Sequence, residues 1–180
     1  MTDVAVVLPG AGYTAQAPLL YWSSVLLEER GWHVQRVDWT VDEEAGAHPH
    51  AFVVEAVERA FDSAPAASAR LIVAKSFGTF ALPWAVGRGI PGVWLTPVLA
   101  DDAVAEALRA AGPEHLAVGG TADGLWRPER AAGTRASLLS IADADHALTV
   151  PGGWSDSIAA QSLAFRAIAA HLDGGVPTVT

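Results

Sequence analysis

The stretch Leu71-Ile72-Val73-Ala74-Lys75-Ser76-Phe77-Gly78 joins a short apolar run directly to a serine that has small residues two positions away on either side. A Gly-x-Ser-x-Gly turn between a strand and a helix presents its serine as a nucleophile, because small residues let the backbone fold tightly there. Here Ala74 and Gly78 occupy the two glycine positions. The pattern alone is not specific, since a serine before a helix is also a common N-cap. A nucleophilic Ser76 therefore requires partners elsewhere in the chain.

Short runs of Val, Leu and Ile alternate along the chain with alanine-rich amphipathic stretches. This alternation predicts strand-helix units and a parallel sheet covered on both faces, a three-layer α/β/α sandwich. The predicted strands are 4–8, 33–37, 71–74, 92–96, 115–118 and 137–141, all continuous apolar runs, as burial on both faces requires. The predicted helices lie near 19–29, 49–61, 77–88, 101–110, 128–132 and 157–172.

Length and composition narrow the possible classes of protein. A chain of 180 residues corresponds to one domain, expected over 1–173, with a short disordered tail over 174–180. The net charge of -9 and the absence of a basic cluster argue against a nucleic-acid partner. Zero cysteines exclude disulfides, thiolate metal sites and a cysteine nucleophile.

No membrane association is expected, because Gly, Pro and charged residues interrupt the apolar runs well before the roughly 20 residues of a membrane helix. A basic segment followed by an apolar stretch, as in a signal peptide, is not found at the N-terminus. The sequence therefore predicts a cytoplasmic protein and leaves its oligomeric state open.

Polar residues follow three of the predicted strands. Ser76 follows the third, Gly119-Gly120-Thr121-Ala122-Asp123 ends the fifth, and Ala142-Asp143-Ala144-Asp145-His146 ends the sixth. In an open parallel sheet, functional groups gather outside the carboxyl ends of the strands. This chain order of Ser, Asp and His suits nucleophilic catalysis, because imidazole takes the serine proton while a buried carboxylate fixes its tautomer. Ser76, Asp123 and His146 are therefore the candidate catalytic residues.

With these motifs the chain resembles, over nearly its whole length, the small, cap-less α/β-hydrolases of the dienelactone-hydrolase-like group. Pro9-Gly10-Ala11-Gly12 resembles the His-Gly-x-Gly oxyanion loop, and 74–78 resembles the nucleophile elbow. The segments 119–123 and 144–148 resemble the acid and histidine loops. Pro9 and Ala74 depart from the histidine and glycine usual in the family. The resemblance implies a minimal α/β-hydrolase fold with a six-stranded parallel sheet, and a serine carboxylesterase that needs no cofactor.

The resemblance also implies an oxyanion hole built from the backbone N–H groups of Ala11 and Phe77. Gly10 and Gly12, on either side of Ala11, would let the chain approach a substrate closely, and the Tyr13 hydroxyl could add a donor. The alternative is that the two glycines only form a tight turn and that Tyr13 is an exposed loop residue.

Three tryptophans, Trp39, Trp126 and Trp154, follow predicted strands on the side of the expected site. Aromatic walls suit apolar substrates, although such rings can also seal the top of a core. The segment 101–113, where larger relatives insert a cap domain, is short. An open, shallow pocket for small to medium apolar acyl groups is therefore expected.

Several charged residues near the motifs have other interpretations. Asp101 and Asp102 are rival acids, but they fit better as charges at the N-terminus of a helix. Asp143 and Asp145 are so close to His146 in sequence that they are expected to shape its loop. Lys75, the only lysine, is expected to form an ion pair beside the elbow.

Two other classes of function remain open. The segment 10–15 fits Gly-x-Gly-x-x-Ala and Asp38 ends the second strand, as in a dinucleotide-binding unit. Against this, Pro18 places the helix start near Ala17, too late to hold a pyrophosphate against Gly12. The other alternative is a non-catalytic interaction module on the same fold. No metal site is predicted, because the six histidines lack the HExxH spacing.

Overall fold

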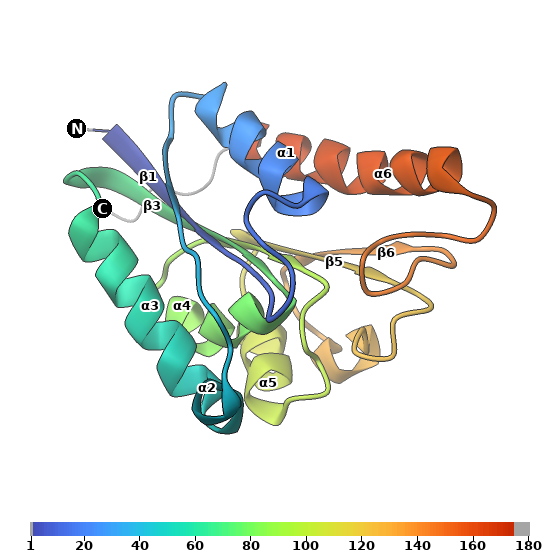
Figure 1. Ribbon diagram of the computed structural model, residues 1–180, viewed down its shortest axis with the longest axis horizontal. Coiled ribbons are helices and arrows are strands. Elements are labelled where there is room, and N and C mark those ends of the chain that lie inside the picture. The colour runs from blue at the N-terminus through green and yellow to red at the C-terminus, as the bar shows by residue number, and fades with distance from the viewer. Residues whose placement is uncertain (1, 175–180) are drawn as a thin grey trace.

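The computed structural model describes residues 2–174, in which six strands form one sheet in the order β2-β1-β3-β4-β5-β6 (Figure 1). Every neighbouring pair of strands runs parallel. The strands are β1 (Thr2–Leu8), β2 (His33–Arg36), β3 (Ala67–Lys75), β4 (Gly92–Leu95), β5 (His115–Gly120) and β6 (Ser137–Ile141). The predicted six-stranded parallel sheet is confirmed.

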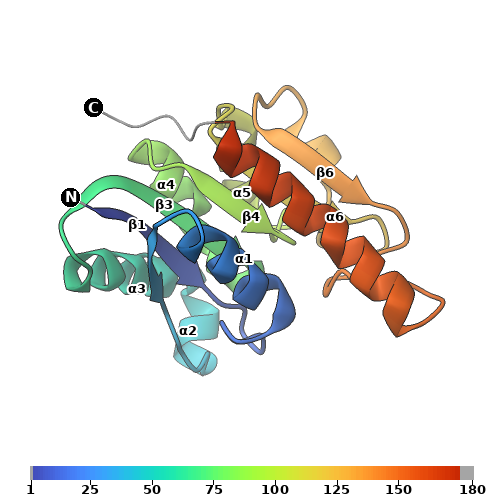
Figure 2. The same cartoon turned by 90° about the horizontal axis from the view of Figure 1, so that it is seen from above.

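Helices cover both faces of the sheet and complete the predicted three-layer sandwich (Figures 1 and 2). One face carries α1 (Pro18–Glu28) and α6 (Trp154–Asp173). The other carries α3 (Pro49–Ser63), α4 (Leu82–Gly87) and α5 (Asp102–Ala110). The short helix α2 (Glu43–Ala47) and the 3-10 turns η1 (Ser76–Ala81) and η2 (Pro128–Ala131) lie in the connections.

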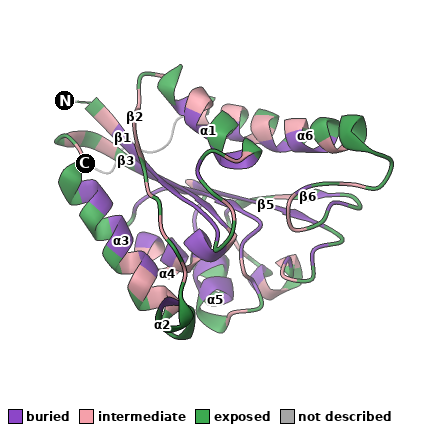
Figure 3. Ribbon diagram, in the orientation of Figure 1, coloured by how far each residue is buried: buried purple, intermediate pink, exposed green. Residues whose placement is uncertain are grey.

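The sheet separates two hydrophobic cores, because successive strand residues point to opposite faces. In β1, Val4, Val6 and Leu8 pack in the core under α3, whereas Ala5 and Val7 pack in the core under α1 and α6. The central strands are buried on both faces (Figure 3). The expectation of burial along all six strands is wrong for β2 and β6, which lie at the edges of the sheet. β2 has no buried residue, and β6 buries only Ile141.

The connections differ from the prediction in three places. The helix predicted at 77–88 is divided into η1 and α4, and Pro83, which lacks an N–H, lies in the first turn of α4. The sequence pattern does not predict α2, which has only five residues and is capped by Asp42. The last helix begins three residues early, at Trp154, directly after Gly153 with φ 129°. Gly174 caps its end, and the rest of the predicted tail lies outside the described residues.

Helices of membrane-spanning length and apolarity do not occur between residues 2 and 174.

Candidate active site

Ser76 stands on a strained turn directly after β3. Its φ of 51° lies in the left-handed region, which non-glycine residues rarely adopt. The hydroxyl of Thr79 donates to the Ser76 carbonyl at 2.5 Å and accepts the Val98 N–H at 3.2 Å, which ties the turn to the segment after β4. Gly78 allows the turn to approach β1, because a Cβ there would lie 2.8 Å from Leu8 Cβ. The elbow therefore has the backbone geometry that presents a serine nucleophile.

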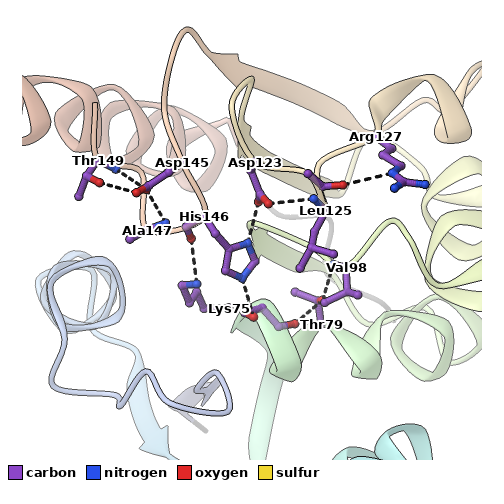
Figure 4. Close-up of polar contacts among 12 residues, drawn as sticks. Lys75, Thr79, Val98, Asp123, Leu125, Arg127, Asp145, His146, Ala147 and Thr149 are labelled. Atoms are coloured by element: carbon purple, nitrogen blue, oxygen red, sulfur yellow. Dashed lines mark hydrogen bonds and ion pairs between the residues drawn. The ribbon is translucent and has the colours of Figure 1, made fainter. Parts of the chain in front are cut away.

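His146 bridges the serine and the acid that the sequence pairs with it (Figure 4). Its Nε2 lies 2.7 Å from Ser76 Oγ, and its Nδ1 lies 2.7 Å from Asp123 Oδ2. The Asp123 side chain is 3% exposed, and its second oxygen, Oδ1, accepts the Leu125 N–H at 2.9 Å. A carboxylate held in this way can keep the proton on Nδ1 and leave Nε2 free to accept the serine proton. The structure thus brings together the three residues from three separate strand ends.

Gly120 makes room for the contact between the acid loop and the histidine loop. A Cβ on Gly120 would lie 2.0 Å from the Ala144 carbonyl oxygen, so only glycine lets the segment after β6 pack against β5. Backbone hydrogen bonds then join the loops, from Ala122 N–H to the Ala144 carbonyl and from Thr121 N–H to the Ile141 carbonyl, both at 2.9 Å. These contacts set the distance between Asp123 and the histidine loop.

Asp145 shapes the histidine loop, as predicted. Its carboxylate accepts the N–H groups of Ala147 and Thr149 at 2.8 and 2.9 Å, and the Thr149 hydroxyl at 2.7 Å. Burial acts to raise the pKa of Asp145, but these bonds, first those from Thr149, lower it overall. The carboxylate therefore stays ionised and keeps the loop closed behind His146.

The Gly10 loop lies against the serine. A Cβ on Gly10 would be 3.5 Å from Ser76 Cβ, and the Gly10 N–H donates to the Tyr13 carbonyl at 2.9 Å. No acceptor for the Ala11 N–H occurs within the described part of the chain, and the Phe77 N–H lies in the first turn of η1, where amides lack an intrahelical acceptor. Gly12 is exposed next to Ala11. The Phe77 amide adjoins Ser76 in the chain and the Ala11 amide follows Gly10, so the oxyanion hole built from these two amides stays a prediction.

Tyr13 also has a structural role. Its hydroxyl accepts the Leu19 N–H at 2.9 Å and so caps the start of α1, where Ala17 provides no side-chain cap. The hydroxyl keeps its own proton to donate, so a hydrogen bond from Tyr13 to a substrate stays a prediction. The cap occupies the Leu19 N–H at the start of α1, where the pyrophosphate of a bound dinucleotide would need free amides. Helix α1 begins at Pro18, as the sequence indicates.

Trp126 does not line the site. It is 6% exposed because its ring fills the space over Gly119, where a Cβ would lie 2.2 Å from the indole, and its N–H donates to Ser140. The prediction that Trp126 binds substrate is corrected accordingly. Trp154 is 82% exposed at the start of α6, and its contact with substrate stays a prediction.

Trp39 does lie at the site. Its indole N–H donates to the Gly10 carbonyl at 3.0 Å, and its ring centre is 6.0 Å from that of Phe77. Phe52 and Phe80 extend this aromatic cluster, at 6.1 and 5.3 Å from Phe77. The phenylalanines were missed because nothing in their spacing distinguishes them from ordinary core residues.

The rival acids point elsewhere. Asp101 caps α5 through the Val104 N–H and meets His50 Nε2 at 3.1 Å, whereas Asp102 pairs with Arg130. Neither contacts His146. Groups of three or more His, Asp or Glu side chains that could hold a metal ion are not present between residues 2 and 174.

Lys75 does not form the predicted ion pair. Its Nζ donates to the His146 carbonyl at 3.0 Å and lies 4.8 Å from the centre of the Tyr13 ring. Burial lowers the pKa of Lys75 to about 8, although the charges of Asp123 and Asp145 act to raise it.

Comparison with solved structures places this geometry in a known fold. No family model and no curated protein matches the sequence. Est1E from Butyrivibrio proteoclasticus, in a structure with bound ferulic acid, is 13% identical and superimposes with a TM-score of 0.70 over 97% of this chain and 89% of its own. An α/β serine hydrolase without a lid from Xanthomonas campestris is 16% identical, with a TM-score of 0.68 over 100% of this chain and 86% of its own.

A dienelactone hydrolase from Anabaena variabilis is 20% identical, with a TM-score of 0.60 over 92% of this chain and 84% of its own. Identities this low relate the folds alone. The fold implied by the motifs is confirmed: the chain has the α/β-hydrolase fold, in a small, cap-less form like that of the dienelactone-hydrolase-like group.

Proposed function

We propose that the protein is a serine hydrolase, a carboxylesterase that cleaves small to medium apolar esters through an acyl-enzyme on Ser76. The observation that carries this proposal is the position of the His146 ring, 2.7 Å from both Ser76 Oγ and Asp123 Oδ2. A histidine that only filled a loop would need neither contact. The fold shared with esterases is consistent with the proposal, although fold alone does not define activity.

In the first half of the reaction, Ser76 Oγ attacks the ester carbonyl carbon while His146 Nε2 accepts its proton. The negative charge that develops on the carbonyl oxygen is stabilised by the N–H groups of Ala11 and Phe77, which typically contribute a few kcal/mol each to such a transition state. Asp123 stabilises the imidazolium. The intermediate then collapses, the bond to the alcohol oxygen breaks, and His146 returns the proton to the leaving alcohol.

In the second half, water takes the place of the alcohol. His146 accepts a proton from the water, whose oxygen attacks the acyl carbon in the same oxyanion hole. Collapse releases the carboxylic acid and returns the proton to Ser76 Oγ.

The substrate class follows from the walls of the site. Trp39, half-buried beside Gly10, offers an apolar surface on one side of Ser76, and only α5 and its short connections lie between β4 and β5. A site with an aromatic wall but no cap buries short acyl chains and leaves long ones in water. Each methylene contributes its roughly 0.8 kcal/mol only when it leaves water, so kcat/KM should peak for acyl chains of about two to six carbons and fall beyond about ten.

A fluorophosphonate probe tests the proposal directly. We expect one adduct, located on Ser76 by peptide mass spectrometry, and turnover of p-nitrophenyl esters that is lost in Ser76→Ala. Labelling of another residue with near-normal activity in that variant would contradict the assignment. No adduct and no turnover on any ester would favour a non-catalytic interaction module.

A further inference from the structure

Lys75 is a cation that the fold buries beside the proposed nucleophile. It is the last residue of β3 and the only lysine of the chain, and it is 2% exposed. Leu71 and Val73 pack in the core under α1 and α6, so strand alternation directs the Lys75 side chain to the same face. The adjacent Ser76 leaves this face at its left-handed turn.

The burial of Lys75 is unfavourable. No carboxylate of the described residues lies within ion-pair distance of its Nζ, and burial lowers its pKa to about 8, above neutral pH. The side chain therefore stays charged where a neutral side chain of similar length would be more stable. A buried charge next to a reactive group points to a role in the site.

The contacts of Lys75 indicate that role. Its Nζ donates to the His146 carbonyl, 71 residues away, and its charge lies over the Tyr13 ring. Tyr13 in turn closes the turn that presents Ala11, because its carbonyl accepts the Gly10 N–H. Figure 4 shows Lys75 reaching the histidine loop next to the serine turn. One side chain thus connects the strand of Ser76 with the loops that carry the base and one oxyanion donor.

We propose that Lys75 is a positioning residue, which fixes the backbone of His146 and the turn of Ala11 relative to Ser76 without touching the substrate. The inference rests on the hydrolase function proposed above. Gln161 also holds the histidine loop, through the Ala147 carbonyl at 3.2 Å, but it does so from α6 and makes no link to the serine strand. Loss of Lys75 should therefore leave the loop folded and displace His146 from Ser76.

The absence of cysteine from the sequence permits a chemical test. Lys75→Cys, alkylated with 2-bromoethylamine in denaturant and refolded, carries an aminoethyl side chain close in shape to lysine. The same protein alkylated with iodoacetamide is the neutral, matched control. Because small misplacements in a site can lower rates about a hundredfold, we expect the control and Lys75→Met to lose about 10- to 100-fold in kcat on p-nitrophenyl butyrate, with KM within about twofold. The aminoethyl protein should return to within about threefold of the wild-type kcat.

Two further measurements separate positioning from folding. Lys75→Met should melt at or above the wild-type temperature, because it removes a buried charge. The downfield proton resonance of the His146–Asp123 hydrogen bond should shift or broaden in Lys75→Met. The control is Arg88→Met. Arg88 is an exposed cation in the α4–β4 connection and pairs with Glu58 of α3, so its loss should change neither kcat nor the resonance.

Full kcat in Lys75→Met, or equal losses in the aminoethyl and carbamidomethyl proteins when both melt cooperatively, would overturn the proposal. A wild-type protein without esterase activity would contradict the proposed function instead. In that case the proton resonance of the His146–Asp123 hydrogen bond still tests the role of Lys75, since an unchanged signal in Lys75→Met would show that Lys75 does not position His146.

Discussion

Because all six strands run parallel, their amino ends lie along one side of the sheet and their carboxyl ends along the opposite side, here called the amino edge and the carboxyl edge. These two edges accommodate left-handed backbone in different ways. At the amino edge, the turns that lead into β2, β4 and β6 use Gly31, Gly89 and Gly133, at φ 79°, 64° and 86°. At the carboxyl edge, the segments that leave β3, β4 and β6 use Ser76, Thr96, Asp143 and Leu148, at φ 51°, 45°, 56° and 56°, and the segment after β6 also contains Gly152 and Gly153. Glycine adopts this conformation freely, whereas other residues lose about 1–2 kcal/mol each. Strain is thus concentrated at the edge where side chains are needed for the proposed chemistry.

The protonation of buried histidine and lysine side chains also differs between the two edges. At the amino edge, His115 Nδ1 accepts the Trp94 indole N–H at 3.1 Å, and burial lowers the pKa of His115 to about 4. His115 is therefore neutral at physiological pH. At the carboxyl edge, Lys75, with a pKa of about 8, remains charged there. Among residues 2–174, a buried lysine or arginine side chain occurs only beside the proposed active site.

The largest effect should follow from replacing Ser76, the point where strain and proposed chemistry coincide. Ser76→Ala and Ser76→Gly should both lower kcat by at least about a thousandfold, as loss of a triad nucleophile does elsewhere. The glycine variant should exceed the alanine variant by about 1 kcal/mol in the free energy of unfolding, because only glycine is unstrained at this φ. Esterase assays and urea denaturation measure the two effects. Equal stability of the two variants would show that the turn is not strained.

Asp123→Asn should have the next largest effect. An amide cannot hold the imidazole in the required tautomer, so we expect kcat to fall by a hundredfold or more with the fold intact. Asp102→Asn is the matched control, since the Asp102 side chain is 89% exposed and pairs with Arg130. Loss of activity in Asp102→Asn or Asp101→Asn, with Asp123→Asn active, would assign the acid to the segment after β4.

The sequence predicted the parts of the site that depend on order along the chain. The small residues around Ser76 and the Gly-Gly before Asp123 mark close approaches of backbone, and the structure places such contacts at Gly78 and Gly120. The apolar strand runs then determine which polar residues share one edge of the sheet.

The rest depends on contacts between distant segments, which a single sequence does not show. Nothing near Lys75 in the sequence indicates that it meets the carbonyl of His146, 71 residues away, instead of a carboxylate. The position of Trp126 after a strand predicts a pocket wall, whereas the structure buries its ring. The available signal was Gly119, since a glycine in a buried strand leaves space that a large ring can fill.

At the amino edge, His115 should make stability depend on pH. The unfolded histidine binds a proton near about pH 6.5, whereas the folded one does so only near about pH 4, so the unfolded state binds more protons between these values. The free energy of unfolding should therefore be complete above about pH 6.5 and fall by about 3 kcal/mol as the pH decreases to about 4. Denaturation of wild type and His115→Gln at pH 7 and 4 isolates this contribution. The same pH dependence in both proteins would contradict it.

The smallest effect expected is that of a methyl group at an amino-edge turn. In Gly89→Ala, the new Cβ meets no atom within 4 Å, so the change tests the φ of 64° alone and should lower the free energy of unfolding by about 1 kcal/mol. Gly87→Ala is the matched control, because Gly87 is the last residue of α4 and its Cβ also meets nothing within 4 Å. There the methyl group should stabilise the protein by roughly 0.5–1 kcal/mol, since alanine favours the helix. Both variants should keep the wild-type kcat/KM, because neither position lies at the carboxyl edge. A change of the same sign in both variants, or a loss of activity in either, would remove the distinction between the two edges of the sheet.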